Sequence, residues 1–341
     1  MKKLFFTIIV LLSVHFIAFS QLKDSKNYTS LDEALKKPLE VSVLDLSGQN
    51  LTQLDDKISE LKNLQVLYLQ DNKLTSLPES LCKNTKLQFL YADENSISKL
   101  PNGFAALKEL KILSLSGNNL SNIPENITQL DKLSALNLSD NKITEVNPKI
   151  KGLKRLTELD LSFNNISTFP MQLTEITGLQ VLLLSANQIA VIPAEISKLT
   201  NLKILYLDEC PLNQIPSGVI NISSLKKLSL ANCNIAVIPN EISKLKNLTH
   251  LLLNNNKIST LPQNLYSMRT LKYLGLATNN IPKISSDINK LTSLYDIDLC
   301  GNKIEAFPEI LGKMPALKYI GISKTGVEMI NYECQVNKNV Y

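Results

Sequence analysis

The sequence lacks most of the residues on which enzymes and metal sites depend. Its 341 residues contain no tryptophan and 2 histidines, of which only His250 lies beyond the first twenty residues. A Ser-His-acid or Cys-His arrangement would have to use this one side chain. No P-loop, Gly-x-Gly-x-x-Gly loop or zinc-ligand spacing occurs. These absences predict a protein that is not an enzyme and that has no cofactor and no metal site.

An excess of charge of one sign is also missing. The formal net charge is +5, and it falls to +3 if Lys2 and Lys3 are removed with the first twenty residues. The sequence shows no stripe of lysine or arginine. Nucleic-acid binding, which depends on such a basic footprint, therefore has no support.

Long apolar runs are confined to the amino terminus. A charged start is followed by the apolar stretch 4–14, and Ala18 and Ser20 occupy the small-residue positions before Gln21. This order predicts a secretory signal peptide at 1–20. An uncleaved anchor is the alternative, but the run is short for a membrane span. We expect an exported protein, periplasmic or secreted to the cell surface, with no membrane span after signal cleavage.

What the sequence does contain is a fixed period of 23 residues. In the unit Leu110 to Lys132, apolar residues fall at positions 1, 4, 6, 11, 14, 18 and 21, Asn118 at position 9 and Pro124 at position 15. The register runs unbroken from Val41 and gives thirteen copies over 41–327. Such a period predicts a solenoid, in which copies that could not fold alone stack and share one core.

Each part of the 23-residue unit predicts a local structure. Alternating apolar residues at positions 4 and 6 indicate a short strand with positions 3 and 5 outward. The recurrent asparagine at position 9 can satisfy the backbone groups that the following turn leaves unpaired. Proline at position 15 ends regular pairing, and the segment after it suits one helical or 3-10 turn. Asp55, Asn147 and Ser285 replace this proline in three copies; such breaks could bend the solenoid locally, but none of them proves a hinge.

The unit resembles the leucine-rich repeat family, with the pattern L-x-x-L-x-L-x-x-N-x-L followed by x-x-L-P-x-x-I-x-x-L. It is most similar to bacterial exported proteins with 23-residue repeats and shares the L-P-x-x-I segment with the intracellular Ras-scaffold type. The resemblance implies an α/β solenoid shaped as a curved horseshoe. Parallel strands would line its concave face and short helical or 3-10 turns its convex face. It also implies binding of proteins without catalysis.

The two ends of the repeat array read as caps. Residues 21–40 form a leader in which Ser30 and Glu33 have the spacing of a capping box, so a short helix is expected before Pro38. This helix would cover the open end of the first copy. Residues 328–341 depart from the repeat pattern and are expected to form a carboxy-terminal cap.

Five cysteines leave one pairing question open. Cys210 and Cys233 both occupy position 9, one period apart, where cysteine can replace the ladder asparagine. A disulfide between them is the alternative, because adjacent strands lie close together and export favours oxidation. Cys82, Cys300 and Cys334 are expected to be unpaired.

Aromatic residues at the outward strand positions give the strongest functional signal. Exposed aromatic surface mixed with polar groups is typical of binding hot spots. The first predicted patch contains Val43, Val66, Tyr68, Phe89, Tyr91 and Ile112. The second contains Val181, Leu183, Ile204 and Tyr206, flanked by Lys227, Glu158 and Asp160. The concave-face residues predicted to bind a partner are Tyr68, Phe89, Tyr91, Ile112, Glu158, Asp160, Leu183, Ile204, Tyr206, Lys227, His250 and Tyr273.

The expected partner is a protein or peptide, recognised by a rigid surface at little entropic cost. The alternative is glycan or cell-surface binding, or adhesion, through the same exposed tyrosines. Carboxylates also occur in pairs, as Glu158/Asp160 and Asp296/Asp298, on one side of a strand each. Such pairs can bind a cation or act in acid-base chemistry. We expect them instead to be solvated charge that selects a basic partner.

Overall fold

The computed structural model describes residues 26–306 and 308–322 of the chain. They fall into two compact units, the first ending at Ile166 and the second beginning at Ser167. The predicted signal peptide at 1–20 and the predicted cap at 328–341 lie outside the described residues. Within the described ranges, no helix has the length and apolar character needed to cross a membrane.

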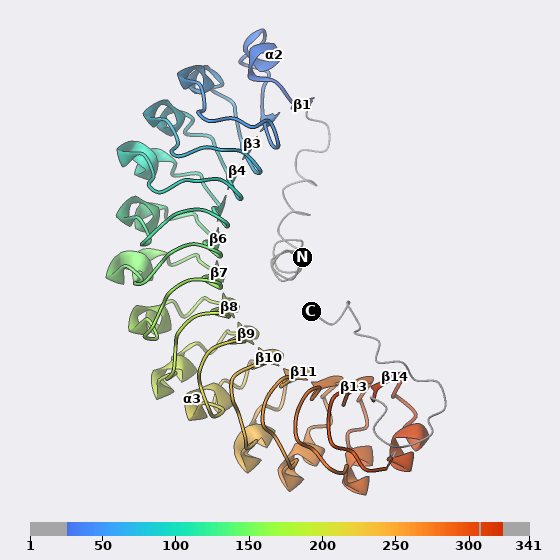
Figure 1. Cartoon of the computed structure of the whole chain (residues 1–341). Coiled ribbons are helices and arrows are strands. Elements are labelled where there is room, and N and C mark those ends of the chain that lie inside the picture. Colours follow the sequence, from blue (N-terminus) through green and yellow to red (C-terminus); the bar gives the residue numbers. More distant parts are fainter. Residues whose placement is uncertain (1–25, 307, 323–341) are drawn as a thin grey trace. The chain divides into compact units, whose positions relative to one another are not determined.

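The first unit is a stack of parallel strands in which each strand pairs with the next one along the chain (Figure 1). One short α-helix precedes the repeats, and a 3-10 turn then follows each strand from β2 to β6. The elements are β1 (Asn27–Tyr28), α2 (Leu31–Leu35), β2 (Val43–Asp45), η1 (Asp56–Glu60), β3 (Val66–Tyr68), η2 (Glu79–Lys83), β4 (Phe89–Tyr91), η3 (Asn102–Ala106), β5 (Ile112–Ser114), η4 (Glu125–Gln129), β6 (Ala135–Asn137), η5 (Pro148–Gly152) and β7 (Glu158–Asp160).

The second unit continues the same alternation, with one turn that is α-helical. Its strands are again parallel and again pair in sequence order. The elements are η6 (Met171–Glu175), β8 (Val181–Leu183), η7 (Ala194–Lys198), β9 (Ile204–Tyr206), α3 (Ser217–Ile220), β10 (Lys227–Ser229), η8 (Asn240–Lys244), β11 (His250–Leu252), η9 (Gln263–Ser267), β12 (Tyr273–Gly275), η10 (Ser286–Lys290), β13 (Asp296–Asp298), η11 (Glu309–Lys313) and β14 (Tyr319–Gly321).

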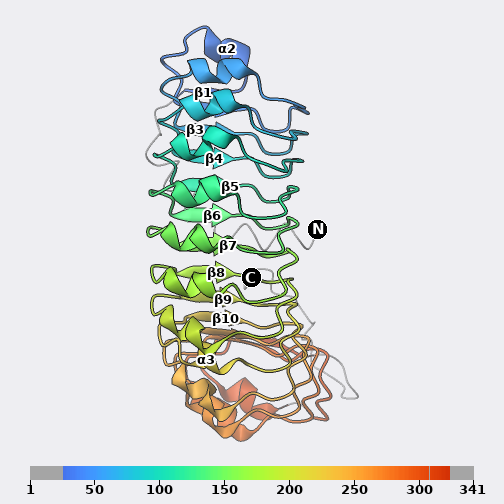
Figure 2. The same ribbon diagram turned by 90° about the vertical axis from the view of Figure 1, so that its left-hand side faces the viewer.

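This architecture confirms the predicted leucine-rich repeat solenoid. From β2 onward, strands recur every 23 residues and the register pairs identical repeat positions, as Val43↔Val66 and Leu44↔Leu67 show. Position 4 is buried in every copy from Leu44 to Ile297, whereas positions 3 and 5 lie on the opposite side of the strand. Within each unit the strands form one face and the helical turns the other (Figure 1). Figure 2 shows the turns of successive copies stacked above one another.

The asparagine ladder at position 9 joins each copy to the one before it. Asn118 Nδ2 donates to the carbonyl of Ala92 at 2.9 Å and to that of Leu115 at 3.1 Å. Its Oδ1 accepts from the Ile97 amide at 2.8 Å. The same arrangement recurs at Asn141. The prediction that these amides satisfy backbone groups of the turn is confirmed.

Cysteine replaces asparagine in two copies of this ladder. Cys210 and Cys233 are buried free thiols, so no disulfide joins them. Cys233 Sγ donates to the Leu207 carbonyl at 3.1 Å, which is the contact that an asparagine amide makes elsewhere. Cys82 is also free. Cys300 is disulfide-bonded, which corrects the expectation of an unpaired thiol, since connectivity does not follow from spacing. Cys334 lies outside the described residues.

The residue at position 15 begins each helical turn. Where it is proline, as at Pro78 and Pro193, it occupies the N-cap in extended conformation. Asp55, Asn147 and Ser285 occupy the same N-cap, and each side chain accepts a hydrogen bond from the amide two residues later. The helical turn therefore begins at the same repeat position in these three copies as in the copies with proline. A side-chain cap replaces the preset φ of proline and keeps the turn unchanged.

The amino-terminal leader joins the sheet as well as forming a helix. Ser30 accepts from the Glu33 amide at 3.4 Å and caps α2, in which Ala34 is fully buried. Before it, Asn27 and Tyr28 pair in parallel with Val43 and Leu44. This additional strand, β1, was not predicted from the sequence because it lies outside the 23-residue pattern. It covers the edge of β2 that the first repeat would otherwise leave open.

Candidate binding surface on the strand face

The candidate surface consists of the outward side chains at positions 3 and 5 of the repeats, which we call the strand face. Position 2 lies at its margin, because Tyr295 at position 2 contacts Tyr273 and Tyr319 at position 3. Neighbouring strands of a sheet lie about 4.8 Å apart. Side chains at one repeat position therefore form columns that run across the strands.

In the first unit the predicted aromatic patch is packed rather than exposed. Phe89, Tyr91 and Ile112 are 4%, 1% and 1% exposed, and they form one cluster with Val66 and Ala135. The expectation that these three side chains are exposed is wrong. Their contribution to partner binding stays a prediction.

These side chains are buried because large residues occupy both position 3 and position 5 on β3 and β4. The Tyr68 and Tyr91 rings stack with centroids 5.1 Å apart and planes at 8°, while Phe89 stands between Val66 and Ile112 in the next column. Side chains that fill two adjacent columns cover one another. Tyr68, half-buried, remains at the margin of the cluster.

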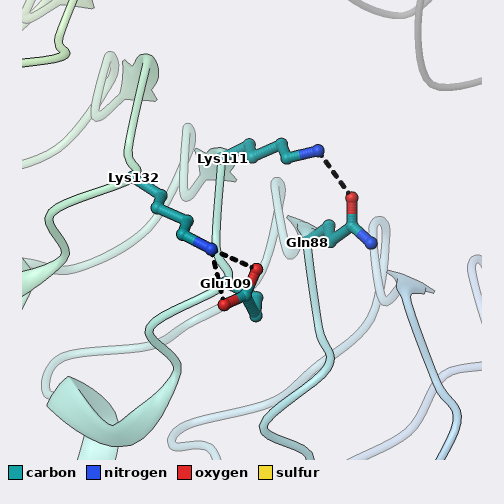
Figure 3. Close-up of polar contacts among 4 residues, drawn as sticks. All are labelled: Gln88, Glu109, Lys111 and Lys132. Atoms are coloured by element: carbon teal, nitrogen blue, oxygen red, sulfur yellow. Dashed lines mark hydrogen bonds and ion pairs between the residues drawn. The ribbon is translucent and has the colours of Figure 1, made fainter.

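A row of polar side chains borders this cluster at position 2. Lys111 Nζ donates to Gln88 Oε1 at 2.8 Å (Figure 3). Gln88 Nε2 in turn donates to Gln65 Oε1 at 3.1 Å. The Lys111 ammonium also lies 6.0 Å from the centre of the Phe89 ring. Figure 3 shows the Lys132–Glu109 ion pair beside it, with Lys132 Nζ 2.7 Å from Glu109 Oε1. The cationic groups at this border are therefore paired within the chain.

Glu158 and Asp160 end the strand face of the first unit. Both are half-buried rather than fully solvated. Burial raises the pKa of Glu158 to about 7. Burial also raises the pKa of Asp160 to about 6, although the Ser162 amide donates to its carboxylate at 2.8 Å and opposes the shift. These groups are poorer sources of fixed negative charge than the sequence suggested.

Most side chains of the second predicted patch are also buried. Val181, Leu183 and Tyr206 are buried, whereas Ile204 and Lys227 are half-buried. The expected exposure of Leu183 and Tyr206 is therefore wrong, because large residues again fill positions 3 and 5 of paired strands. Lys227 has its pKa lowered by burial.

Farther along the second unit, four aromatic rings form a continuous row across β11 to β14. His250 stacks on Tyr273 with ring centroids 4.2 Å apart and planes at 19°. Tyr273 meets Tyr295 edge to face at 5.9 Å, and Tyr295 meets Tyr319 in the same way at 5.3 Å. The first three rings are half-buried and Tyr319 is 49% exposed. We call these four residues the aromatic row.

Tyr273 and Tyr319 stay accessible because the position 5 residue on each of their strands is glycine, although Leu252 on β11 and Asp298 on β13 occupy the same column. Gly275 and Gly321 occupy position 5 beside Tyr273 and Tyr319. A Cβ at Gly275 would lie 2.8 Å from Asn254 Oδ1, and one at Gly321 would lie 2.5 Å from Asp298 Oδ1. Larger residues at these two places would crowd the polar side chains beside them. Sequence reasoning identified His250 and Tyr273 but missed Tyr295, because position 2 was not counted as part of the strand face.

His250 is held as a neutral ring. The Thr249 hydroxyl donates to the Lys226 carbonyl at 3.0 Å, so it accepts from Nδ1 of His250, 2.8 Å away. Burial, reinforced by the charges of Lys227 and Lys272, lowers the pKa of His250 to about 4. This ring is a hydrogen-bonded member of the aromatic row with no neighbouring nucleophile on its strand.

Lysines accumulate along the margin of the second unit. Lys203, Lys226, Lys272 and Lys318 all occupy position 2 and are exposed. No basic stripe is evident in the linear sequence because these residues are 23 or 46 positions apart along the chain. Stacking of the copies aligns them in one column, so the expectation that no such stripe exists is corrected.

The carboxylates of this region are buried or hydrogen-bonded to the backbone. Asp296 is buried. Asp298 accepts from the Cys300 amide at 3.0 Å, and burial raises its pKa. No group of three or more His, Cys, Asp or Glu side chains in the described ranges is placed to hold a metal ion.

Comparison with known proteins matches both units to one type of repeat. The model described as "Leucine rich repeat" matches residues 40–97, 93–143, 108–166, 133–189 and 154–212, and the model described as "Leucine-rich repeat region" matches residues 217–331. No curated protein sequence matches the chain significantly.

Several solved structures share the fold. A leucine-rich repeat protein of Leptospira interrogans is 26% identical with a TM-score of 0.67, over 86% of this chain and 99% of that one. An internalin of Listeria monocytogenes is 24% identical with a TM-score of 0.74, over 85% and 84%. The plant peptide hormone receptor RGFR1, solved in complex with RGF2, is 27% identical with a TM-score of 0.62, over 82% and 50%.

Proposed function

Because the chain belongs to the leucine-rich repeat family, we propose that it is a non-enzymatic scaffold that binds a protein or peptide through its strand face. The observation that carries the proposal is the partly exposed aromatic row, in which three rings lie on paired strands and Tyr295 directly precedes β13. Rings fixed in this way lose little conformational freedom on binding. The similarity to a plant receptor solved with its peptide hormone supports the same use of the fold.

Site-specific photocrosslinking tests this proposal. A photoreactive residue at Tyr273 should give a covalent adduct with a protein or peptide from the native envelope or culture fluid. The matched control is Thr260, which is exposed and lies outside the strands. Adducts at Tyr273 but not at Thr260 support the proposal. No adduct at Tyr273, or equal adducts at both, would overturn it.

Export is part of the same proposal and rests on the amino-terminal sequence. A charged start, an apolar stretch and small residues before Gln21 support cleavage there. The mature protein should be recovered from the periplasm or the medium, and its first residue should be Gln21. Recovery from the cytoplasm with Met1 intact would contradict export.

A further inference from the structure

The chemistry of the partner can be inferred from the aromatic row, and this inference rests on the proposed function. In the aromatic row, each ring has a neighbouring ring between 4.2 and 5.9 Å away. His250 and Tyr273 cover each other's faces, and the Tyr273–Tyr295 and Tyr295–Tyr319 contacts have interplanar angles of 61° and 64°. These contacts cover one face each of His250 and Tyr273 and one further face at each edge-to-face contact, so the row has fewer open faces than four isolated rings would.

Covered faces disfavour a sugar as the occupant. A pyranose recognised by stacking needs an open ring face, because the attraction comes from the electron density above the ring. The aromatic row instead offers ring edges and phenolic hydroxyls. Ring edges pack against apolar side chains, and hydroxyls hydrogen-bond with the backbone groups of a peptide.

The charged residues around the aromatic row indicate which net charge its partner should carry. Lys272 and Lys318 are exposed on either side of Tyr295 in the position 2 column, and Lys227 precedes His250 in the position 3 column. Burial lowers the pKa of His250, and the positive charges of Lys227 and Lys272 lower it further. Asp296 and Asp298 lie in the columns of the strand face and offset part of this potential, but Asp296 is buried and Asp298 half-buried. The charges that a partner meets first are therefore the exposed Lys272 and Lys318.

We infer that the aromatic row and the lysines beside it bind an extended peptide segment in which acidic side chains flank apolar or aromatic ones. The segment would cross the strands. The three spacings from β11 to β14 span about 14 Å, which an extended peptide covers with about four or five residues. Carboxylates of the segment would reach Lys227, Lys272 or Lys318, and its apolar side chains would pack on the ring edges.

Peptide selection on the folded full-length chain tests this assignment. A random library of displayed 12-residue peptides is panned against the chain, and selected sequences are synthesised and titrated by fluorescence anisotropy. We expect enrichment of Asp or Glu next to aromatic or apolar residues. Tyr295→Ser and Lys272→Glu should each weaken binding at least tenfold.

Matched variants separate the aromatic row from the rest of the molecular surface. Tyr68→Ser removes a stacked, half-buried tyrosine of the first unit, and Lys257→Glu makes the same charge change at an exposed site outside the strands. Both should leave the affinity within about twofold. Circular dichroism melts of every variant show that the losses do not come from unfolding.

Each other outcome overturns a distinct claim. Selected peptides that are not acidic, or that bind Tyr295→Ser as well as the unchanged chain, reject this inference while the proposed function stands. If Tyr68→Ser abolishes binding instead, the first unit is the site. If no peptide is selected, but an anionic polysaccharide such as heparin binds in a Tyr295-dependent way, both the inference and the proposed function fail.

Discussion

The strand faces of the two units carry the same residue types at the same repeat positions but differ in what they expose. In the first unit, Phe89 and Tyr91 lie within a packed cluster. In the second, Tyr273 and Tyr319 stay accessible, because glycine occupies the neighbouring position 5. A tyrosine on an outward strand position is therefore a core residue or a surface residue according to the size of its neighbours.

The two regions therefore differ in whether their apolar side chains contribute to folding or remain exposed. The cluster of the first unit removes apolar area from water and stabilises the stack, at about 25 cal/mol for each Å² buried. The aromatic row of the second unit leaves part of that area exposed and thus available to a partner. The following predictions test this contrast, from the largest expected effect to the smallest.

Truncation of a ring should be costly in the first unit and mild in the second. Phe89→Ala leaves a cavity in a closely packed cluster and should lower the free energy of unfolding by about 3–4 kcal/mol. Tyr319→Ala removes an exposed ring and should cost less than about 1 kcal/mol. Urea denaturation followed by circular dichroism measures both values. Similar losses for the two variants would show that the units do not differ in packing.

The asparagine ladder should contribute more to stability where it is intact. Asn118→Ala leaves the carbonyls of Ala92 and Leu115 and the amide of Ile97 without their side-chain partner. We expect a loss of about 2–3 kcal/mol in the same denaturation experiment. Cys233→Ala removes weaker sulfur contacts and should cost about 1 kcal/mol. Equal costs would mean that the thiol is as good a ladder residue as the amide.

One carboxylate in each unit, the half-buried Asp93 and the buried Asp208, should make a similar contribution to the pH dependence of stability. Asp93 accepts from the Ser116 amide at 2.8 Å and from the Ser114 hydroxyl. Asp208 accepts from the Ala231 amide at 2.6 Å and from the Ser229 hydroxyl. Burial raises the pKa of each to about 6, from the ordinary value of 3.8. The folded state therefore holds these protons more tightly than the unfolded state.

A raised pKa in the folded state fixes the sign of the effect. The stabilisation is complete below about pH 4 and is lost as the pH rises through about 6. Asp93→Asn and Asp208→Asn should each reduce the fall in stability between these values by about 2 kcal/mol. Thermal melts at about pH 4.5 and about pH 7.5, on either side of the raised pKa, measure the change. An unchanged pH profile in both variants would contradict the assignment.

The smallest effects should come from the turn at position 8. Gly117 in the first unit and Thr278 in the second both have positive φ, at 65° and 55°. A β-branched residue is strained there, so Thr278→Gly should stabilise the chain by about 0.5 kcal/mol. Gly117→Ala should destabilise it by about 1 kcal/mol, since a Cβ would lie 2.6 Å from Glu94 Oε1. Melting temperatures that shift in the opposite directions would refute a role for backbone strain at this turn.

Most of the fold follows from the sequence because the 23-residue period repeats one local structure. The strand at Ile112–Ser114, the ladder amide of Asn118 and the turn after Pro124 each depend on residues within one copy and its neighbours. The strand at Asn27–Tyr28 was missed because no repeat precedes it. The state of Cys300 was missed because a disulfide depends on spatial proximity, which the repeat register does not describe.

The candidate surface was less predictable because exposure depends on neighbouring columns. Alternation places Tyr91 and Tyr273 on the same side of their strands, but only the size of the residues beside them determines which ring is covered. Tyr295 shows a second reason why repeat position alone does not predict the surface: it occupies position 2, but its ring contacts Tyr273 in the position 3 column. Both residue type and the side chains of adjacent copies determine which rings a partner can reach.

Hydroxyl-radical footprinting of the full chain, free and bound to a selected acidic peptide, tests most directly whether the aromatic row is the binding surface. We predict that Tyr273, Tyr295 and Tyr319 are labelled in the free chain and protected in the complex. Phe89 and Tyr91 should be labelled weakly in both states. Strong labelling of Phe89 and Tyr91 that the peptide suppresses, with no change at Tyr295 and Tyr319, would contradict it.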